Sequence, residues 1–297
     1  MRYLYYPGCS LKTAHKGYED SLLAVFETLG RPLEELEDWN CCGATAYMAV
    51  DELKAFALAA RNLALAEQIA GDEPVAIVAP CNACYLVLTK AQRYMEEFDH
   101  IGRRIRSALG EAGMEYEGRV KVRHPLDVLI NDIGLEALRG AAHQPQERMK
   151  VACYYGCQIV RPYADFDDQY YPMSMDLVLR ALGVETMEWP LKTRCCGGSL
   201  TGTMETTGQR LSYIILREAH ERGANLVATC CPLCQLNLEF FQPDMRRKFR
   251  DDPHMPSGDL HMPVAYFTQV MGLALGLDEE TLGLRALFVP VTDLATV

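Results

Sequence analysis

The stretch Asp38–Tyr47 reads DWNCCGATAY, and it places two adjacent cysteines, Cys41 and Cys42, directly before Gly43. The stretch TRCCGGSLTG repeats this arrangement at residues 195–197. Adjacent cysteines rarely form a disulfide with each other, because the required geometry strains the peptide between them. The repeated pair therefore predicts another role for these thiols, and a glycine after each pair would let the backbone approach a bound group closely.

The cysteines around these two pairs follow one pattern twice. In the first pattern 31 residues separate a single cysteine from the pair, and 38 residues separate the pair from a C-x-x-C motif. In the second pattern the two gaps are 37 and 34 residues. The ten patterned cysteines are Cys9, Cys41, Cys42, Cys81 and Cys84 in the first set and Cys157, Cys195, Cys196, Cys231 and Cys234 in the second.

The sequences that flank the cysteines repeat as well. YYPGCSL in the first half matches YYGCQIV in the second, and VAIVAPCNACYLVL matches NLVATCCPLCQLNL. We therefore expect two structural copies, residues 1–145 and 146–297. The segment GAAHQPQERMK at 140–150 is polar and contains Pro145, which is typical of a linker.

Short apolar runs alternate with helical patterns in both halves. RYLYYP, VAIVAP, KVACYY and NLVATC read as strands, each followed by a cysteine, and the spacing of apolar residues between Asp51 and Gly71 predicts a helix. Such alternation predicts an α/β fold with two pseudo-symmetric Rossmann-like halves, each built on a parallel sheet. Ligands of such sheets bind outside the carboxyl ends of the strands, so three cysteine loops of each half are expected to converge there.

Composition limits the classes of function. The net charge of −11 argues against nucleic acid as a partner, since phosphate binding needs a basic surface. No apolar run is long enough to span a membrane and the N-terminal residues lack a signal-peptide pattern, so we expect a cytoplasmic protein. Twelve cysteines in a large chain without an export signal favour metal binding or redox chemistry over a disulfide framework.

Each half offers five patterned cysteines, whereas a structural zinc ion or a cubane iron–sulfur cluster takes four ligands. Side chains of neighbouring residues diverge, so an adjacent pair serves two metal atoms more easily than one, which favours a cluster over a single ion. Gly43 and Gly197 are then expected to line such a cluster. Zinc ligation and buried structural thiols remain open alternatives. Cys153 and Cys230 have no counterpart in the first half and are expected to be structural.

The duplicated pattern, with CCG at both pairs together with YYPGCSL and CPLCQLNL, resembles the cysteine-rich CCG domain family and within it the B-type subunits of heterodisulfide reductase. The resemblance covers nearly the whole chain. It implies two noncubane [4Fe-4S] clusters, one held by the five cysteines of each half. It also implies reduction of the disulfide CoM-S-S-CoB in methanogenesis, or of a related sulfur substrate. The partners that it implies are the A-type, flavin-bearing and the C-type, ferredoxin-like subunits of such a complex.

Four further residues are candidates for contact with a small anionic disulfide. Arg161, Lys192 and Arg194 lie close in sequence to the cysteines of the second half and offer positive charge, although such residues are more often ordinary surface residues. His124 precedes the helical pattern PLDVL, where a histidine is more often a helix cap or core residue than a catalytic acid.

Opening a disulfide takes two electrons, and one cluster ordinarily supplies one. Two clusters that face each other in a duplicated fold would meet this demand. No G-x-G-x-x-G or Walker motif occurs, so we expect no flavin or nucleotide in this chain and electrons from another protein of the complex. Three alternatives stay open: an electron relay in a quinone- or flavin-linked oxidoreductase, a bacterial oxidoreductase acting on other disulfides or sulfur compounds, and a zinc-stabilised scaffold.

Overall fold

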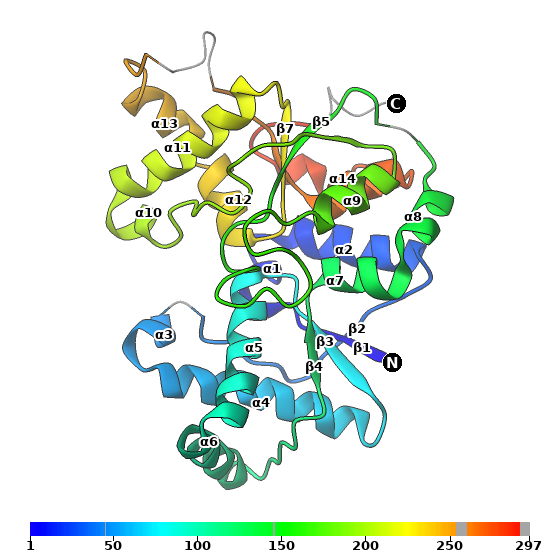
Figure 1. Ribbon diagram of the computed structural model, residues 1–297, viewed down its shortest axis with the longest axis vertical. Coiled ribbons are helices and arrows are strands. Elements are labelled where there is room, and N and C mark those ends of the chain that lie inside the picture. The colour runs from blue at the N-terminus through cyan, green and yellow to red at the C-terminus, as the bar shows by residue number, and fades with distance from the viewer. Residues whose placement is uncertain (45, 145, 254–259, 292–297) are drawn as a thin grey trace. The chain divides into compact units, whose positions relative to one another are not determined.

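The computed structural model describes residues 1–44, 46–144, 146–253 and 260–291. The chain forms two compact units (Figure 1). Unit 1 comprises Met1–Ala14 and Pro32–Val128, and unit 2 comprises His15–Arg31 and the chain from Leu129 onward. Residue 145, inside the predicted linker, lies outside the described residues, so the division of the sequence copies into 1–145 and 146–297 stays a prediction.

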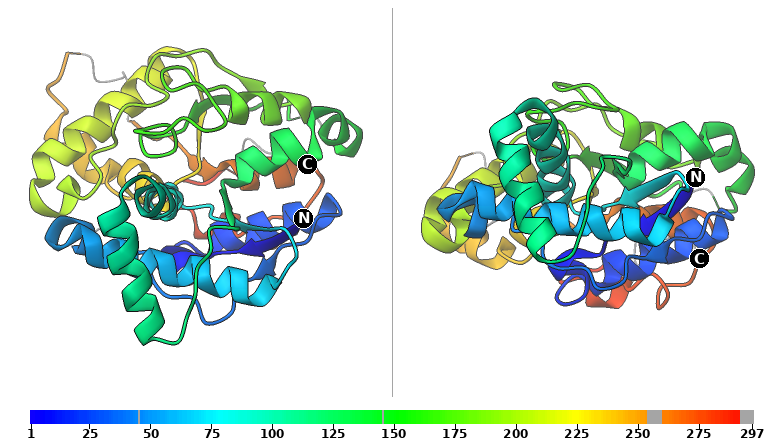
Figure 2. Two further views of the ribbon diagram at one scale, coloured as in Figure 1. Left: turned by 60° about the horizontal axis from the view of Figure 1, so that its bottom comes forward. Right: turned by 90° about the horizontal axis from the view of Figure 1, so that it is seen from below.

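Unit 1 is built on a four-stranded parallel sheet with the strand order β2-β1-β3-β4. Its elements are β1 (Arg2–Tyr5), α1 (Gly8–Leu11), β2 (Glu34–Glu35), α3 (Ala46–Val50), α4 (Glu52–Ala70), β3 (Val75–Val78), α5 (Asn82–Glu97), α6 (Asp99–Glu111), β4 (Lys121–Arg123) and α7 (Pro125–Val128). Helices α4, α5 and α6 pack against one another and can be followed from light blue to teal in the further views (Figure 2).

Unit 2 repeats this sheet with the order β6-β5-β7-β8, again all parallel. Its elements are α2 (Lys16–Thr28), the π-helical turn η1 (Leu129–Ile133), α8 (Leu135–Ala141), β5 (Lys150–Tyr154), α9 (Ser174–Ala181), β6 (Glu185–Thr186), α10 (Leu200–Thr203), α11 (Glu205–Glu221), β7 (Leu226–Thr229), α12 (Pro232–Glu239), α13 (Gln242–Lys248), β8 (Val264–Tyr266), α14 (Phe267–Ala274) and the 3-10 turn η2 (Leu284–Ala286). The identical order of four parallel strands in the two units confirms the predicted pseudo-symmetric α/β fold.

The predicted helix between Asp51 and Gly71 is confirmed as α4. The Asp51 carboxylate accepts a hydrogen bond from the Lys54 backbone N–H at 3.2 Å, which satisfies a free donor at the helix N-terminus. Gly71 follows the helix with a φ of 60°, a value that favours glycine, and its N–H bonds to the Glu67 carbonyl. The four apolar runs predicted as strands are β1, β3, β5 and β7.

Helix α2 comes early in the chain but packs in unit 2, against α14. The ring of Tyr18 stacks on that of Tyr266 with centroids 4.1 Å apart and an interplanar angle of 3°. The Ser21 hydroxyl also lies 2.7 Å from the Thr268 hydroxyl, and both side chains are buried. One helix from the first half of the sequence therefore belongs to the unit that the second half builds.

The core of unit 2 contains a carboxyl group, that of Glu239 at the end of α12. Its Oε1 atom accepts the Val289 backbone N–H at 3.1 Å, and Oε2 accepts a hydrogen bond from Gln235. Burial disfavours the charged form and raises the pKa of Glu239 to about 7 from an ordinary 4.5.

Glu239 should make the stability of the protein depend on pH. Between pH 4.5 and 7 the unfolded chain releases this proton while the folded chain keeps it, so stability falls as pH rises through that window and is flat for this group above it. The expected loss is about 3 kcal/mol or less. Glu239→Gln should remove this pH dependence. The free energy of unfolding of the variant, measured anaerobically with denaturant, should therefore rise relative to that of the wild type between pH 5 and pH 8. A constant difference between the two proteins at both pH values would contradict the assignment.

Candidate metal centres

Three loops of unit 1 bring five thiols together beyond the carboxyl ends of its strands. Cys9 follows β1, the adjacent pair follows β2, and the C-x-x-C motif follows β3 and begins α5. From β1 the chain first adds β2 on one side and then returns to add β3 on the other side of β1. Ligands of such sheets bind where the strand order changes direction in this way, here between β1 and β3. The parallel register of Tyr5 opposite Val78 brings the ends of these two strands level.

The sulfur contacts of unit 1 connect Cys41, Cys42, Cys81 and Cys84. Cys42 Sγ lies 3.2 Å from Cys84 Sγ, which is too far for a disulfide bond, and none of the five cysteines forms a disulfide. Contacts with the sulfurs of Cys42 and Cys81 raise the pKa of Cys84 well above its ordinary value. A contact with the Cys42 thiol raises the pKa of Cys41 above its ordinary value, and the Cys9 thiol acts in the same direction more weakly. The five thiols therefore converge as the sequence predicts.

Unit 2 contains the same arrangement. Cys196 Sγ lies 3.5 Å from Cys234 Sγ, and contacts with the sulfurs of Cys196 and Cys231 raise the pKa of Cys234 well above its ordinary value. A contact with Cys157 lowers the pKa of Cys195 to about 6. In both units the second cysteine of the pair and both cysteines of the C-x-x-C motif are buried, whereas the remaining two are exposed or half-buried. The two cysteines of each pair thus differ in exposure, although the thiols of Cys41 and Cys42 also contact each other.

The glycines after the double cysteines have backbone conformations that L side chains rarely adopt. Gly43 has a φ of 80° and Gly197 a φ of 103°. A Cβ atom on Gly197 would lie 2.9 Å from the backbone of Gly208, closer than real Cβ contacts come. A Cβ on Gly43 would meet Ala55 at 3.3 Å. Close approach to a helix backbone therefore requires glycine at Gly197, and the positive φ favours glycine at Gly43. A role beside a bound cluster stays a prediction for both.

Thiols are the donor set that iron–sulfur clusters require, and the cysteines gathered in each unit, two of which have their sulfurs 3.2 Å or 3.5 Å apart, fit such a group. Within the described ranges, no group of three or more His, Cys, Asp or Glu side chains is arranged to hold a single metal ion. The chemistry of the donor set therefore fits the clusters implied by the resemblance, whose number and type stay open.

Two tyrosines near the cysteines were not selected from the sequence. The Tyr6 hydroxyl donates to the Asn40 carbonyl at 2.7 Å, and the Tyr154 hydroxyl donates to the Arg194 carbonyl at 2.5 Å. Each carbonyl belongs to the residue just before a double cysteine. The signal was present in the repeated YYPGC and YYGC, but tyrosine in a strand ordinarily indicates core packing.

The structure separates the three predicted cations of unit 2. Arg161 and Arg194 are exposed beside Cys195, and Arg161 donates to the Thr193 carbonyl two residues before it. Lys192 is instead fully buried, with Nζ 2.8 Å from Asp176 Oδ2 and 3.1 Å from the Pro172 carbonyl. A part in substrate binding stays a prediction for all three, and the buried ion pair argues for a structural role of Lys192.

His124 has the position of a helix cap in unit 1. Its Nδ1 atom accepts the Leu126 backbone N–H at 3.2 Å, and Nε2 lies 3.2 Å from the Pro80 carbonyl, just before Cys81. Complete burial lowers the pKa of His124 to about 3, so the ring is neutral at physiological pH. A neutral ring fixed at both nitrogens holds the C-x-x-C loop in place, and a substrate role stays a prediction.

The two cysteines without a counterpart are buried in unit 2. Cys153 lies within β5, where burial raises its pKa well above the ordinary value. The Cys230 thiol lies 3.6 Å from the Tyr155 carbonyl, and its own carbonyl accepts the Tyr18 hydroxyl at 3.4 Å. These contacts agree with the expected structural role.

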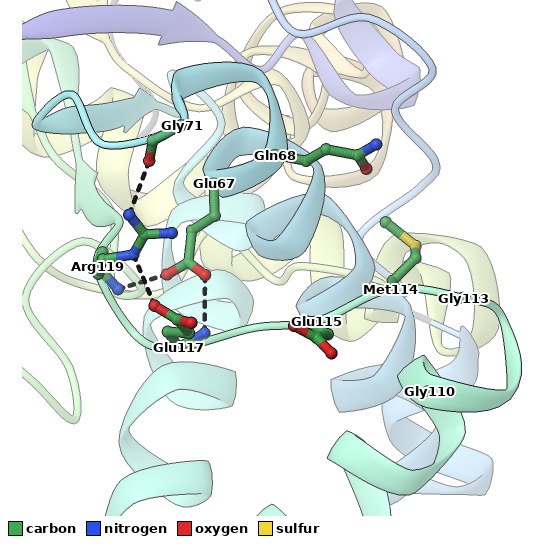
Figure 3. A pocket seen from close by; sticks show the side chains of 9 residues that line it. All are labelled: Glu67, Gln68, Gly71, Gly110, Gly113, Met114, Glu115, Glu117 and Arg119. Atoms are coloured by element: carbon green, nitrogen blue, oxygen red, sulfur yellow. Dashed lines mark hydrogen bonds and ion pairs between the residues drawn. The ribbon is translucent and has the colours of Figure 1, made fainter.

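A cavity of about 480 Å³ in unit 1 lies where α4 and α6 end, and it is polar (Figure 3). The Glu67 carboxylate accepts the backbone N–H groups of Glu117 (2.7 Å) and Arg119, while the Arg119 guanidinium donates to the Gly71 carbonyl at 2.7 Å. The charged groups of this cavity therefore hold the loop that leads into β4 through hydrogen bonds.

None of the helices in the described ranges combines the length and the apolar character that crossing a membrane requires.

The comparisons with known proteins agree with the repeat. A family model described as CCG, cysteine-rich domain, matches residues 3–89 and 151–239. The chain is 32% identical to the 8-methylmenaquinol:fumarate reductase membrane anchor subunit of Wolinella succinogenes, over 98% of each chain.

Two further relatives carry heterodisulfide reductase names. A protein of Archaeoglobus profundus, named as similar to the B-type subunit of heterodisulfide reductase, is 29% identical over 94% of this chain and 92% of its own. The B-type subunit of a ferredoxin/F(420)H(2)-dependent CoB-CoM heterodisulfide reductase of Methanosarcina acetivorans is 27% identical over 94% and 90%. A crystal structure of a hypothetical protein from Helicobacter pylori shares the fold, with a TM-score of 0.77 and 14% identity, over 98% of this chain and 52% of that one.

The buried ion pair allows a structural role of Lys192 to be tested. Lys192→Met leaves the Asp176 charge buried and unpaired, so we expect a loss of about 3–5 kcal/mol in the free energy of unfolding. Lys192→Met combined with Asp176→Asn should recover much of that loss. Arg194→Met, at an exposed site, is the control and should leave stability nearly unchanged. A Lys192→Met protein as stable as the wild type, measured by anaerobic denaturant unfolding, would contradict the structural role.

Proposed function

Because this chain belongs to the cysteine-rich CCG domain family, we propose that it is the iron–sulfur redox subunit of a complex similar to heterodisulfide reductase. The substrate would be CoM-S-S-CoB or a related anionic disulfide, and the partners would be flavin-bearing and ferredoxin-like subunits. The observation that carries the proposal is the convergence of cysteines outside any disulfide, after three strands of each unit. Relatives with heterodisulfide reductase names, similar over nearly their whole length, support it.

The ten patterned cysteines would hold two [4Fe-4S] clusters of the noncubane type, five cysteines to each. When bound, the clusters supply the two electrons that, with two protons, convert one disulfide into two thiols. Buried cysteines of each set would hold the inner side of the group, and the exposed ones would leave it accessible from solvent. Arg161 and Arg194 supply positive charge next to Cys195, where an anionic substrate would be attracted.

A second function is supported by another observation. The relative from Wolinella succinogenes is named as a subunit of an 8-methylmenaquinol:fumarate reductase and is 32% identical over 98% of both chains. On this alternative the chain relays electrons in a quinone- or flavin-linked oxidoreductase and performs no substrate chemistry itself. The cysteine sites would be the same, so the sulfur ligands do not distinguish the two functions.

Iron content tests the two-cluster proposal. Protein purified without oxygen should contain about eight iron atoms per chain, four for each cluster. Cys41→Ala and Cys195→Ala should each lower the iron content, whereas Cys153→Ala, at a buried position outside the pattern, is the matched control and should leave it unchanged. Iron near four atoms per chain, or zinc in its place, would contradict the proposal.

Response to a disulfide separates the enzyme from the relay. If the chain carries the reaction, the anaerobic complex reduced by a viologen dye should consume an anionic disulfide, and adding the disulfide should change the electron paramagnetic resonance spectrum. Cys42→Ala and Cys196→Ala should each abolish turnover rather than halve it, because both electrons are needed. Full iron content without turnover or spectral change on any of a panel of anionic disulfides, but with oxidation by a naphthoquinone, would favour the relay.

A further inference from the structure

The two thiol sites match position by position, which allows their differences to be located. Tyr6 and Tyr154 both lie three residues before the first cysteine of their set and bind the carbonyl before the double cysteine. Side chains also contact the carbonyl just before each C-x-x-C motif, that of His124 in unit 1 and that of Tyr18 in unit 2. The frame around both sites is therefore the same, and a residue that differs within it has a local effect.

The clearest difference is a hydrogen bond to sulfur in unit 2. Asn237 Nδ2 donates to Cys196 Sγ at 3.4 Å and to the Gly198 carbonyl at 2.9 Å. Its Oδ1 atom accepts the Thr201 hydroxyl at 2.8 Å. The Gly198 carbonyl also accepts the Thr201 hydroxyl at 3.1 Å. An amide oxygen placed 2.9 Å from this carbonyl oxygen would be repelled, so the amide group is held with Nδ2 toward Gly198 and the sulfur. The side chain is fully buried, and water does not compete for this hydrogen bond.

The matching position of unit 1 has no donor. Asn237 lies three residues after Cys234 in α12, and the residue three after Cys84 in α5 is Val87. Residues three apart lie on one face of a helix, so both side chains belong to the face that carries the cysteine. Val87 is buried and apolar. The inner sulfur of unit 1 therefore receives no hydrogen bond from this position.

The charges near the outer cysteines differ in the same direction. Arg161 lies four residues after Cys157, where unit 1 has Thr13 after Cys9. Arg194 precedes the double cysteine of unit 2, where unit 1 has Asn40. Unit 2 therefore presents an N–H donor and two cations to its thiols at places where unit 1 presents an apolar residue and two neutral polar residues.

Donors and cations near sulfur ligands stabilise the more negative, reduced form of a cluster and raise its reduction potential. Building on the proposed function, we infer that Asn237 is a positioning residue that raises the reduction potential of the unit 2 cluster above that of the unit 1 cluster. One electron added to the protein then resides first on the unit 2 site. The two halves of the duplicated fold are on this view unequal, with unit 2 the electron acceptor of the pair.

The test is a redox titration of the iron-loaded protein, followed by electron paramagnetic resonance with dithionite as reductant and mediator dyes. The protein should have two midpoint potentials, and the single-site variants Cys42→Ala and Cys196→Ala assign each one. Asn237→Leu is close in shape but has no donor. It should lower the equilibrium constant for reduction of the unit 2 cluster about tenfold, which lowers its midpoint potential by about 59 mV for one electron. The unit 1 midpoint should stay in place.

Three further variants complete the design. Val87→Asn should raise the unit 1 midpoint, and Val87→Leu, which adds no donor, should leave both midpoints unchanged. Thr201→Val removes the hydroxyl that orients Asn237 without removing the amide, and should shift the unit 2 midpoint in the same direction as Asn237→Leu. These changes need no turnover to be measured.

Unchanged midpoints in iron-replete Asn237→Leu overturn the inference. Where that variant does not fold or load iron, an unchanged unit 1 midpoint in Val87→Asn overturns it. A higher midpoint in unit 1 than in unit 2 of the wild type also overturns it. Failure of the proposed function would look different, because the wild type itself would then lack iron and give no cluster signal to titrate.

Discussion

The parallel pairing of β1 with β3, and of β5 with β7, is the constraint on which both thiol sites depend. Parallel strands end at the same edge of a sheet, so the loops after them meet although Cys9 and Cys81 lie 72 positions apart in the sequence. The cysteines of the C-x-x-C motifs then begin α5 and α12, which fixes them relative to the sheet. A shift of register would move each loop away from the others and separate the thiols.

Hydrogen bonds to main-chain carbonyls stabilise these loops around the sulfur atoms. Tyrosine hydroxyls hold the residue before each double cysteine, and His124 and Tyr18 hold the residue before each C-x-x-C motif. Each of these bonds fixes the backbone directly before a cysteine. Two different side chains perform the same task in the second case, one that follows β4 of unit 1 and one from the early helix α2, so the two copies share the contact although the residue differs.

Duplication has left the inner thiols alike and their neighbours different. The Sγ–Sγ contacts of 3.2 Å and 3.5 Å are nearly equal, whereas Asn237 in one unit is matched by Val87 in the other. Unit 2 also contains the buried pair of Lys192 and Asp176, which explains a cation near the cysteines without reference to a substrate. The ion pair therefore gives Lys192 a structural role, and a part in substrate binding stays a prediction for Lys192, Arg161 and Arg194 alike.

The sequence by itself determined the two copies, the strands that precede the cysteines and the ten thiols, because spacing and alternation are local properties that one chain displays directly. It also determined α4 and both its ends, since capping by Asp51 and termination by Gly71 involve neighbouring residues only. Only the tertiary structure decided that α2 packs in unit 2, that Lys192 is buried, and that Asn237 reaches Cys196. These depend on contacts between residues distant along the chain, which no local pattern records.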